Sequence, residues 1–161
     1  MRRPRVDQRE VVAEAEIDEV EGLVGDTWRA RGSRSRPDRS SDPEAQITVM
    51  SARAASQFAG ATERWPLAGD QFYVDLDIGE ENLPAGSRIA IGDAVLEVSA
   101  KPHTGCAKFS SRFGPEALRA VSSSDGRAQR LRGMNTRVVS GGVVRAGDEV
   151  RVVERPPVAR P

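Results

Sequence analysis

Residues 88–100 read Arg88-Ile-Ala-Ile-Gly-Asp-Ala-Val-Leu-Glu-Val-Ser-Ala100, two apolar runs that flank a Gly-Asp pair. Gly92-Asp93 can adopt the positive backbone angles of a two-residue hairpin turn, so we predict strands at 88–91 and 94–100. The apolar side of such a hairpin has to be buried against further strands or helices. This stretch therefore predicts a sheet at the centre of the fold.

Strand-like runs continue on both sides of the hairpin. The run Phe72–Ile78 alternates apolar and polar residues and is the clearest single strand. Further strands are predicted at 47–50, 136–140 and 149–153.

Helical patterns are few and short. We predict helices at 51–61 and at 115–121, where Pro115 suits the first turn, and the pattern at 11–24 fits either a helix or a strand. Many short strands with glycine turns favour a mostly β fold. We expect a closed or nearly closed β-barrel with a few short helices, because closure removes exposed strand edges.

The length and the polar segments bound the domain organisation. A chain of 161 residues suits one domain, 1–161. Residues 28–45 are rich in Arg, Ser, Asp and Pro and are predicted to form a flexible polar loop. Residues 155–161 are predicted to form a frayed tail.

The composition excludes several classes of function. With 24 basic and 24 acidic side chains the formal net charge is zero, so we expect no binding to nucleic acid or to a membrane surface. No apolar run is long enough to span a bilayer, and no signal peptide is recognisable. The single cysteine forms no internal disulfide, and we expect a cytoplasmic protein.

The cysteine is the best candidate for chemistry. Cys106 stands in Lys101-Pro-His-Thr-Gly-Cys-Ala-Lys-Phe109, beside the only histidine and the only two lysines. The thiolate is the reactive form of cysteine, and neighbouring positive charge favours it. The alternative is a buried cysteine that packs as a small hydrophobic residue. The polar flanks favour a reactive thiol on a loop.

Two neighbours of Cys106 are candidate catalytic residues. His103 could take the thiol proton or orient the loop, and its alternative is an ordinary surface histidine. Lys108 lies two residues past the cysteine and would share its side of a resumed strand, where it would stabilise the thiolate. His103 and Cys106 provide too few ligands for a zinc site, and no papain-like or dinucleotide-binding signature is present.

Several motifs together resemble the MOSC domain family, named for the C-terminal part of molybdenum cofactor sulfurase and also found in small bacterial proteins. The succession covers most of 20–152. Its motifs are Gly22-Leu-Val-Gly-Asp26, Gly79-Glu-Glu-Asn-Leu83, Ile91-Gly-Asp-Ala94, Pro102 to Lys108, Arg132-Gly-Met-Asn135 and Gly147-Asp148.

The resemblance implies a barrel of the pyruvate-kinase-barrel-like type in which Cys106 carries sulfur or ligates the metal of a molybdenum cofactor (molybdopterin). The phosphate of that cofactor needs arginine or amide donors, for which Arg132 and Arg137 are candidates, with Asn135 beside them. Asn82 would contact the ligand or fix a turn. The implied activity is sulfur transfer or molybdenum-dependent reduction of N-hydroxylated compounds.

The sequence departs from the larger family members in two respects. It contains neither a pyridoxal phosphate-linked cysteine desulfurase part nor an extra N-terminal barrel, and we expect an early barrel strand to be short or missing. The expected partners are a small-molecule or cofactor ligand and a sulfur-donor or electron-transfer protein. The pattern leaves a monomer and a homodimer open.

A second hypothesis is a non-catalytic binding module. Residues 29–39 carry five arginines, and the planar guanidinium matches phosphate and carboxylate oxygens in pairs. In that case the barrel would recognise a partner protein or a small anion through this segment, and Cys106 would be packed inside.

Overall fold

The structure, a computed structural model, describes residues 1–157. Residues 158–161, most of the predicted tail at 155–161, lie outside the described residues. Within 1–157 the strands are β1 (Glu14–Asp18), β2 (Gly22–Leu23), β3 (Ile47–Ser51), β4 (Phe72–Val74), β5 (Arg88–Ile91), β6 (Ala94–Val98), β7 (Met134–Ser140), β8 (Gly142–Arg145) and β9 (Val150–Glu154).

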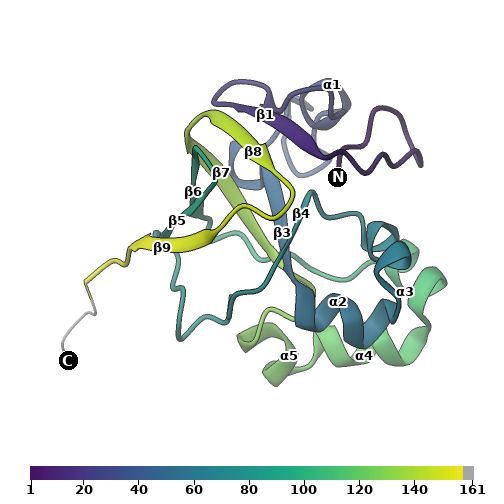
Figure 1. The fold of residues 1–161 in the computed structure, drawn as a ribbon. Coiled ribbons are helices and arrows are strands. Elements are labelled where there is room, and N and C mark those ends of the chain that lie inside the picture. Colours follow the sequence, from purple (N-terminus) through teal and green to yellow (C-terminus); the bar gives the residue numbers. More distant parts are fainter. Residues whose placement is uncertain (158–161) are drawn as a thin grey trace.

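The helices of the same range are short. The α-helices are α1 (Trp28–Arg31), α2 (Ala52–Ala59), α3 (Ala107–Phe113), α4 (Pro115–Ser122) and α5 (Ser124–Ala128), and the 3₁₀ helices are η1 (Pro43–Ala45) and η2 (Thr62–Ala68). Figure 1 shows α2, α3, α4 and α5 gathered at one end of the molecule, with β1, β8 and α1 at the other. No helix of residues 1–157 has the length and apolar character needed to cross a bilayer.

The strands form two sheets. Six strands pair in the order β4-β3-β7-β6-β5-β9, and three pair in the order β2-β1-β8. The larger sheet curls strongly into a half-barrel, and the smaller sheet lies across it (Figure 1). The predicted barrel-like β fold with short helices is confirmed, with more helix than the sequence pattern indicated.

The predicted hairpin forms as expected. Strands β5 and β6 pair antiparallel, with Ile91 opposite Ala94 at the turn. Gly92 has a φ of 53°, and a Cβ at this position would collide with the carboxylate of Asp148 and lie 3.0 Å from the carbonyl oxygen of Val143. Only glycine fits this turn, because the backbone is left-handed and its surroundings are filled.

The strand predicted at 72–78 is shorter than its pattern. Hydrogen-bonded pairing covers Phe72–Val74, as the edge strand β4 beside β3. Val74 and Ile78 are nevertheless buried, while Asp75 and Asp77 are exposed. The alternation of apolar and polar residues therefore indicates which side chains face the core. It continues beyond Val74, where the hydrogen-bonded pairing with β3 ends.

The structure decides the segment 11–24, which fitted either a helix or a strand, and shows local order in the segment 28–45, predicted to be a polar loop. The stretch 11–24 forms strands β1 and β2, with Ile17 opposite Leu23. The segment 28–45 carries a short helix at each end, and between them the amide of Ser33 donates to the carbonyl oxygen of Ser40 at 2.9 Å.

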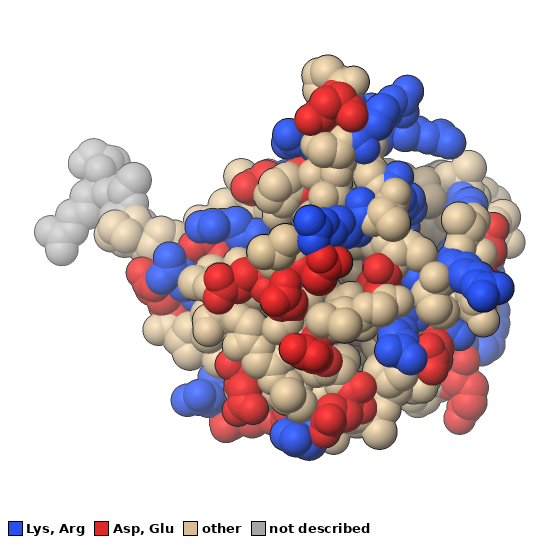
Figure 2. All heavy atoms as spheres, turned by 90° about the horizontal axis from the view of Figure 1, so that it is seen from above, with Lys and Arg blue, Asp and Glu red and all other residues tan. Residues whose placement is uncertain are grey.

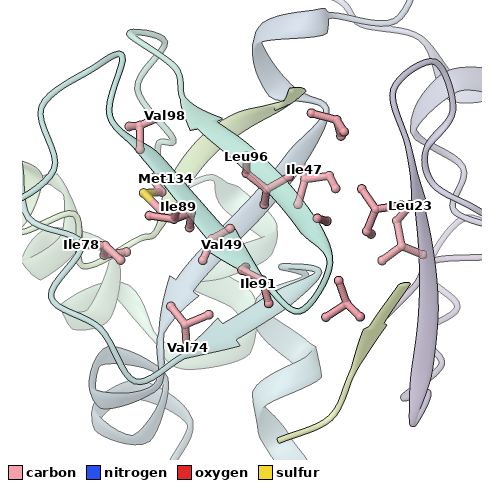
Figure 3. Close-up of a cluster of buried hydrophobic side chains, with 14 of the residues drawn as sticks. Leu23, Ile47, Val49, Val74, Ile78, Ile89, Ile91, Leu96, Val98 and Met134 are labelled. Atoms are coloured by element: carbon pink, nitrogen blue, oxygen red, sulfur yellow. The ribbon is translucent and has the colours of Figure 1, made fainter. Parts of the chain in front are cut away.

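The main core fills the inside of the curled sheet. Figure 3 shows its side chains converging from strands of the two sheets and from the loop that follows β4. Its buried members include Leu23, Ile47, Val49, Val74, Ile78, Ile89, Ile91, Leu96, Val98 and Met134. A second apolar layer packs under the helices and includes Met50, Ala54, Ala55, Phe109 and Val121. The loop from β6 to α3 runs between the sheet and this helical layer.

Charge is mixed on the face of the molecule seen from above. Figure 2 shows acidic and basic side chains interspersed on the face seen from above Figure 1. The face carries no broad field of one sign, in agreement with a formal net charge of zero.

Candidate functional site

The loop 99–106 brings the candidate cysteine to the surface between sheet and helices. Its start is anchored to β7, because the side-chain amide of Asn135 donates to the carbonyl oxygen of Lys101 at 3.2 Å and the amide of Ser99 donates to Asn135 O at 3.0 Å. Cys106 is the N-cap residue of α3 and is exposed, with a free thiol. Its sulfur is thus not packed in the core.

A helix, rather than a resumed strand, follows the cysteine. Because α3 begins at Ala107, Lys108 lies in its first turn, and the shared strand side assumed from the sequence does not exist. The Lys108 ammonium donates to Asp7 Oδ1 at 2.7 Å and stays largely exposed. Lys108 and Cys106 nevertheless line the same cavity.

A buried ion pair lies behind the cysteine loop. Arg132 Nη1 donates to Asp70 Oδ2 at 2.6 Å, and Nη2 donates to the carbonyl oxygen of Ala68 at 2.9 Å. Asp70 is 0% exposed and Arg132 is 7% exposed. The guanidinium carbon also lies 5.0 Å from the ring centroid of Phe109, within cation–π range. Arg132 Nε is buried without a hydrogen-bond partner.

His103 packs against this ion pair. Its Nδ1 lies 3.3 Å from Asp70 Oδ1 and makes no hydrogen bond. Burial, together with the charge of Arg132, lowers the pKa of His103 to about 4, while Asp70 opposes this shift. The imidazole is therefore neutral at pH 7. Gly133 permits the close packing, since a Cβ there would lie 2.7 Å from the carbonyl oxygen of Val49.

Two cavities meet at His103 and Arg132, which line both. The first, the cysteine cavity, has a volume of about 250 Å³ and includes Cys106 in its wall. The second has a volume of about 300 Å³, and its wall includes Lys101, Pro102 and Met134.

Positive charge gathers around the cysteine cavity. Its basic lining residues are Arg3, Arg5, Arg9, Arg31, Lys108, Arg112 and Arg132. Burial lowers the pKa of Arg9, and the nearby charge of Arg112 lowers it further. Burial likewise lowers the pKa of Arg31, with a contribution from Arg3. Arg9 Nε is buried without a hydrogen-bond partner. These cations are incompletely neutralised, which makes the cavity suited to an anion.

A model of the MOSC domain family matches residues 36–151. The chain belongs to the MOSC domain family.

Solved structures share the fold of this MOSC chain at low sequence identity. YiiM from Escherichia coli superposes with a TM-score of 0.60 at 20% identity, over 91% of this chain and 65% of that chain. The YuaD protein from Bacillus subtilis gives 0.58 at 20% identity, over 86% and 84% of the two chains. YiiM from Geobacillus stearothermophilus gives 0.55 at 21% identity, over 70% and 56%. A search of curated proteins gives no significant match.

Three residues that the MOSC resemblance offered as ligand contacts line neither cavity. Arg137 pairs with Glu97 at 2.8 Å across β6 and β7. The side-chain amide of Asn82 donates to the carbonyl oxygen of Asp77 at 2.6 Å, and its Oδ1 accepts from Arg155 at 2.8 Å. Asn135 is buried and donates its side-chain amide to the carbonyl oxygen of Lys101, so it too is absent from the residues that line the two cavities.

Several residues of the site of this MOSC domain escaped sequence reasoning. Asp70 follows Gly69 in a pair typical of turns, and nothing in the local sequence marks Asp70, Arg9 or Arg112 as a functional residue. Arg31 belongs to the arginine-rich segment 29–39 and does reach the cavity. The tertiary fold brings these residues together from distant parts of the chain.

Residues 1–157 contain no group of three His, Cys, Asp or Glu side chains placed to hold a metal ion.

The state of His103 predicts a pH dependence of stability. Its folded pKa of about 4 lies below the ordinary value of 6.5, so the unfolded chain binds a proton first. The stability associated with a neutral His103 is complete above pH 6.5. It is lost as the pH falls toward 4, and the loss is on the order of 2 kcal/mol. We expect the free energy of unfolding to fall between pH 7 and pH 4.5 in the wild type by about 2 kcal/mol more than in His103→Gln. Urea unfolding at the two pH values measures this difference. Equal pH dependence in the two proteins would contradict a neutral buried histidine.

Proposed function

We propose that this MOSC protein binds a molybdenum-pterin cofactor, or a related sulfur-bearing species, through Cys106. The reaction would be sulfur transfer or molybdenum-dependent reduction. The observation that carries the proposal is the exposed thiol of Cys106 in a cavity lined by several arginines, of which Arg9 and Arg31 have no acidic partner among the ion pairs of the described residues. A bound cofactor would supply a soft metal centre able to exchange sulfur or electrons.

The donor set fits such a group. Thiolate sulfur is a ligand for soft metals, and guanidinium groups bind phosphate oxygens in pairs. Cys106 would provide the sulfur, while Arg9, Arg31 and Arg112 would hold the phosphate of the pterin. The buried and unpartnered Nε of Arg9 supports this assignment, because a bound anion would satisfy it.

His103 has a matching role in the proposal. Ligation or sulfur loading requires the thiolate, so the proton of Cys106 has to leave. A neutral imidazole carries an acceptor nitrogen, and His103 lines the same cavity as Cys106. Because its pKa is lowered to about 4, His103 would hold the proton only transiently and pass it to water, with Asp70 Oδ1 lying 3.3 Å from its Nδ1.

The setting follows from the same chemistry. A free reactive thiol persists in a reducing compartment, so we infer a cytoplasmic protein. The sulfur or the electrons have to come from outside a chain with one cysteine, and a sulfur-donor or electron-transfer protein is the inferred partner.

A binding module for small anions is the second candidate function. The arginines of the cavity favour it, because Arg31 from the segment 29–39 reaches the same wall as Arg9 and Arg112. This function requires the arginines and not the sulfur of Cys106. The two candidates therefore differ in their dependence on the thiol.

The test compares cofactor loading in two proteins. The wild type and Cys106→Ser are purified from cells that make molybdenum cofactor, and molybdenum and pterin are measured per chain. We expect the wild type to carry both molybdenum and pterin. The molybdenum content per chain of the serine variant should be lower by about tenfold or more, since a hydroxyl is a poor ligand for a soft metal. Ser111→Ala, a similarly small change on α3, should load like the wild type.

The contrary results separate the candidates. Full loading of the serine variant would refute a role of the sulfur. The anion-binding module would be favoured if the purified wild type carries neither molybdenum nor pterin, and if the wild type and Cys106→Ser bind phosphate with the same affinity.

A further inference from the structure

The N-terminal segment forms a hairpin whose two ends are fixed. The backbones of Arg2 and Glu10 exchange two hydrogen bonds of 2.9 Å. The N-terminal ammonium of Met1 donates to the carbonyl oxygen of Gln71 at 2.7 Å. Arg3 forms an ion pair with the buried carboxylate of Asp26 at 3.0 Å. The base of the hairpin is thus held firmly against the body of the molecule.

The tip of the same hairpin, residues 5–8, is exposed and contributes to the wall of the cysteine cavity. Asp7 lies at this tip with a φ of 59°, a left-handed conformation that costs energy for a residue with a side chain. Its Oδ1 accepts from Lys108 Nζ at 2.7 Å and lies 3.7 Å from Arg112 Nη2. Asp7 therefore joins the tip to helix α3.

We propose that Lys108 and Arg112 form an oxyanion site in which the carboxylate of Asp7 takes the place of the ligand until an anion displaces it. Carboxylate and phosphate oxygens accept the same charge-assisted hydrogen bonds, so one can replace the other. The side chains of Lys108 and Asp7 are 62% and 60% exposed. An ion pair so exposed to water is weak and can be displaced at small cost.

A third cation supports the exchange. Arg9 Nη1 donates to the backbone carbonyl oxygen of Asp7 at 3.3 Å, while its Nε is buried and has no partner. The carboxylate of Asp7 leaves this donor unsatisfied. A phosphate, with more acceptor oxygens than a carboxylate, could contact Lys108, Arg112 and Arg9 together. The tip would then move away from α3 as the anion enters.

This inference rests on the same cavity as the proposed function and adds its regulation, but it requires no metal and no reaction at Cys106. The probe is inorganic phosphate, applied at low ionic strength to protein free of molybdenum and pterin. The readout is the phosphate concentration that halves the rate at which neutral iodoacetamide alkylates Cys106.

Two variants break the same ion pair and are expected to act in opposite directions. Asp7→Asn removes the competing charge and should lower the half-protecting phosphate concentration by about fivefold or more. Lys108→Gln removes part of the site and should raise it by a similar factor. Glu116→Gln is the matched control for Asp7→Asn, because Glu116 sits in an exposed ion pair with Arg119 on α4 and its neutralisation raises the net charge by the same amount.

Each result is decisive. Opposite shifts with an unchanged control support the displaced carboxylate, even if the protein carries no molybdenum cofactor. Shifts in the same direction would mean that breaking the pair only loosens the tip, and the inference would be overturned. It would also be overturned if phosphate protects neither the wild type nor Asp7→Asn, whatever the outcome of cofactor loading.

Discussion

Arg132→Met is expected to lower the free energy of unfolding by about 3–5 kcal/mol, the cost of removing one partner from a buried ion pair. The carboxylate of Asp70 is 0% exposed and would lose its charged partner at 2.6 Å. The carbonyl oxygen of Ala68 and the ring of Phe109 would also lose their contacts with the guanidinium. Urea unfolding followed by far-UV circular dichroism measures the change.

Two controls distinguish the effect of burying the Arg132–Asp70 ion pair from the effect of removing an arginine charge. Arg137→Met removes a partly exposed arginine that pairs with Glu97, and it should cost about 1 kcal/mol or less. Adding Asp70→Asn to Arg132→Met removes the uncompensated charge and should restore part of the loss. If Arg132→Met and Arg137→Met unfold with the same free energy, the buried pair does not stabilise the site.

The parts of the fold that could be predicted are those marked by residues within one continuous stretch of sequence. The hairpin at 88–100 was correct to the turn, because the apolar runs and the Gly-Asp pair lie within one continuous stretch. Helix α3 was not predicted, since seven residues provide fewer than two turns in which to distinguish a helical period from alternation. The error carried over to Lys108, which was placed on a strand that does not form.

The candidate site was predictable in part for the same reason. Cys106 and His103 stand together in one loop and were found from the sequence. Arg137 could have been set aside, because it lies between the buried Thr136 and Val138 in a predicted strand and so faces away from the core. Asp70 and the cavity arginines could not be found, since their proximity depends on contacts between distant segments.

The Cys106 thiol is exposed and lies in the wall of a cavity lined by seven basic side chains. Such a cavity attracts anions, so the rate at which anionic iodoacetate alkylates Cys106 should rise relative to the rate with neutral iodoacetamide. We expect the ratio of the two alkylation rates at low ionic strength to exceed that of a neutral model thiol, N-acetylcysteine amide, by about tenfold. The excess should shrink with added salt, because salt screens exposed charges.

The most direct measurement is therefore this ratio of alkylation rates for Cys106 in the native protein, with the modified residue identified by mass spectrometry. We expect Cys106 to react in the native protein, to prefer the anionic reagent, and to lose this preference in salt. A thiol that stays unmodified until urea unfolds the protein, or that shows no preference for iodoacetate over the model thiol, would contradict it.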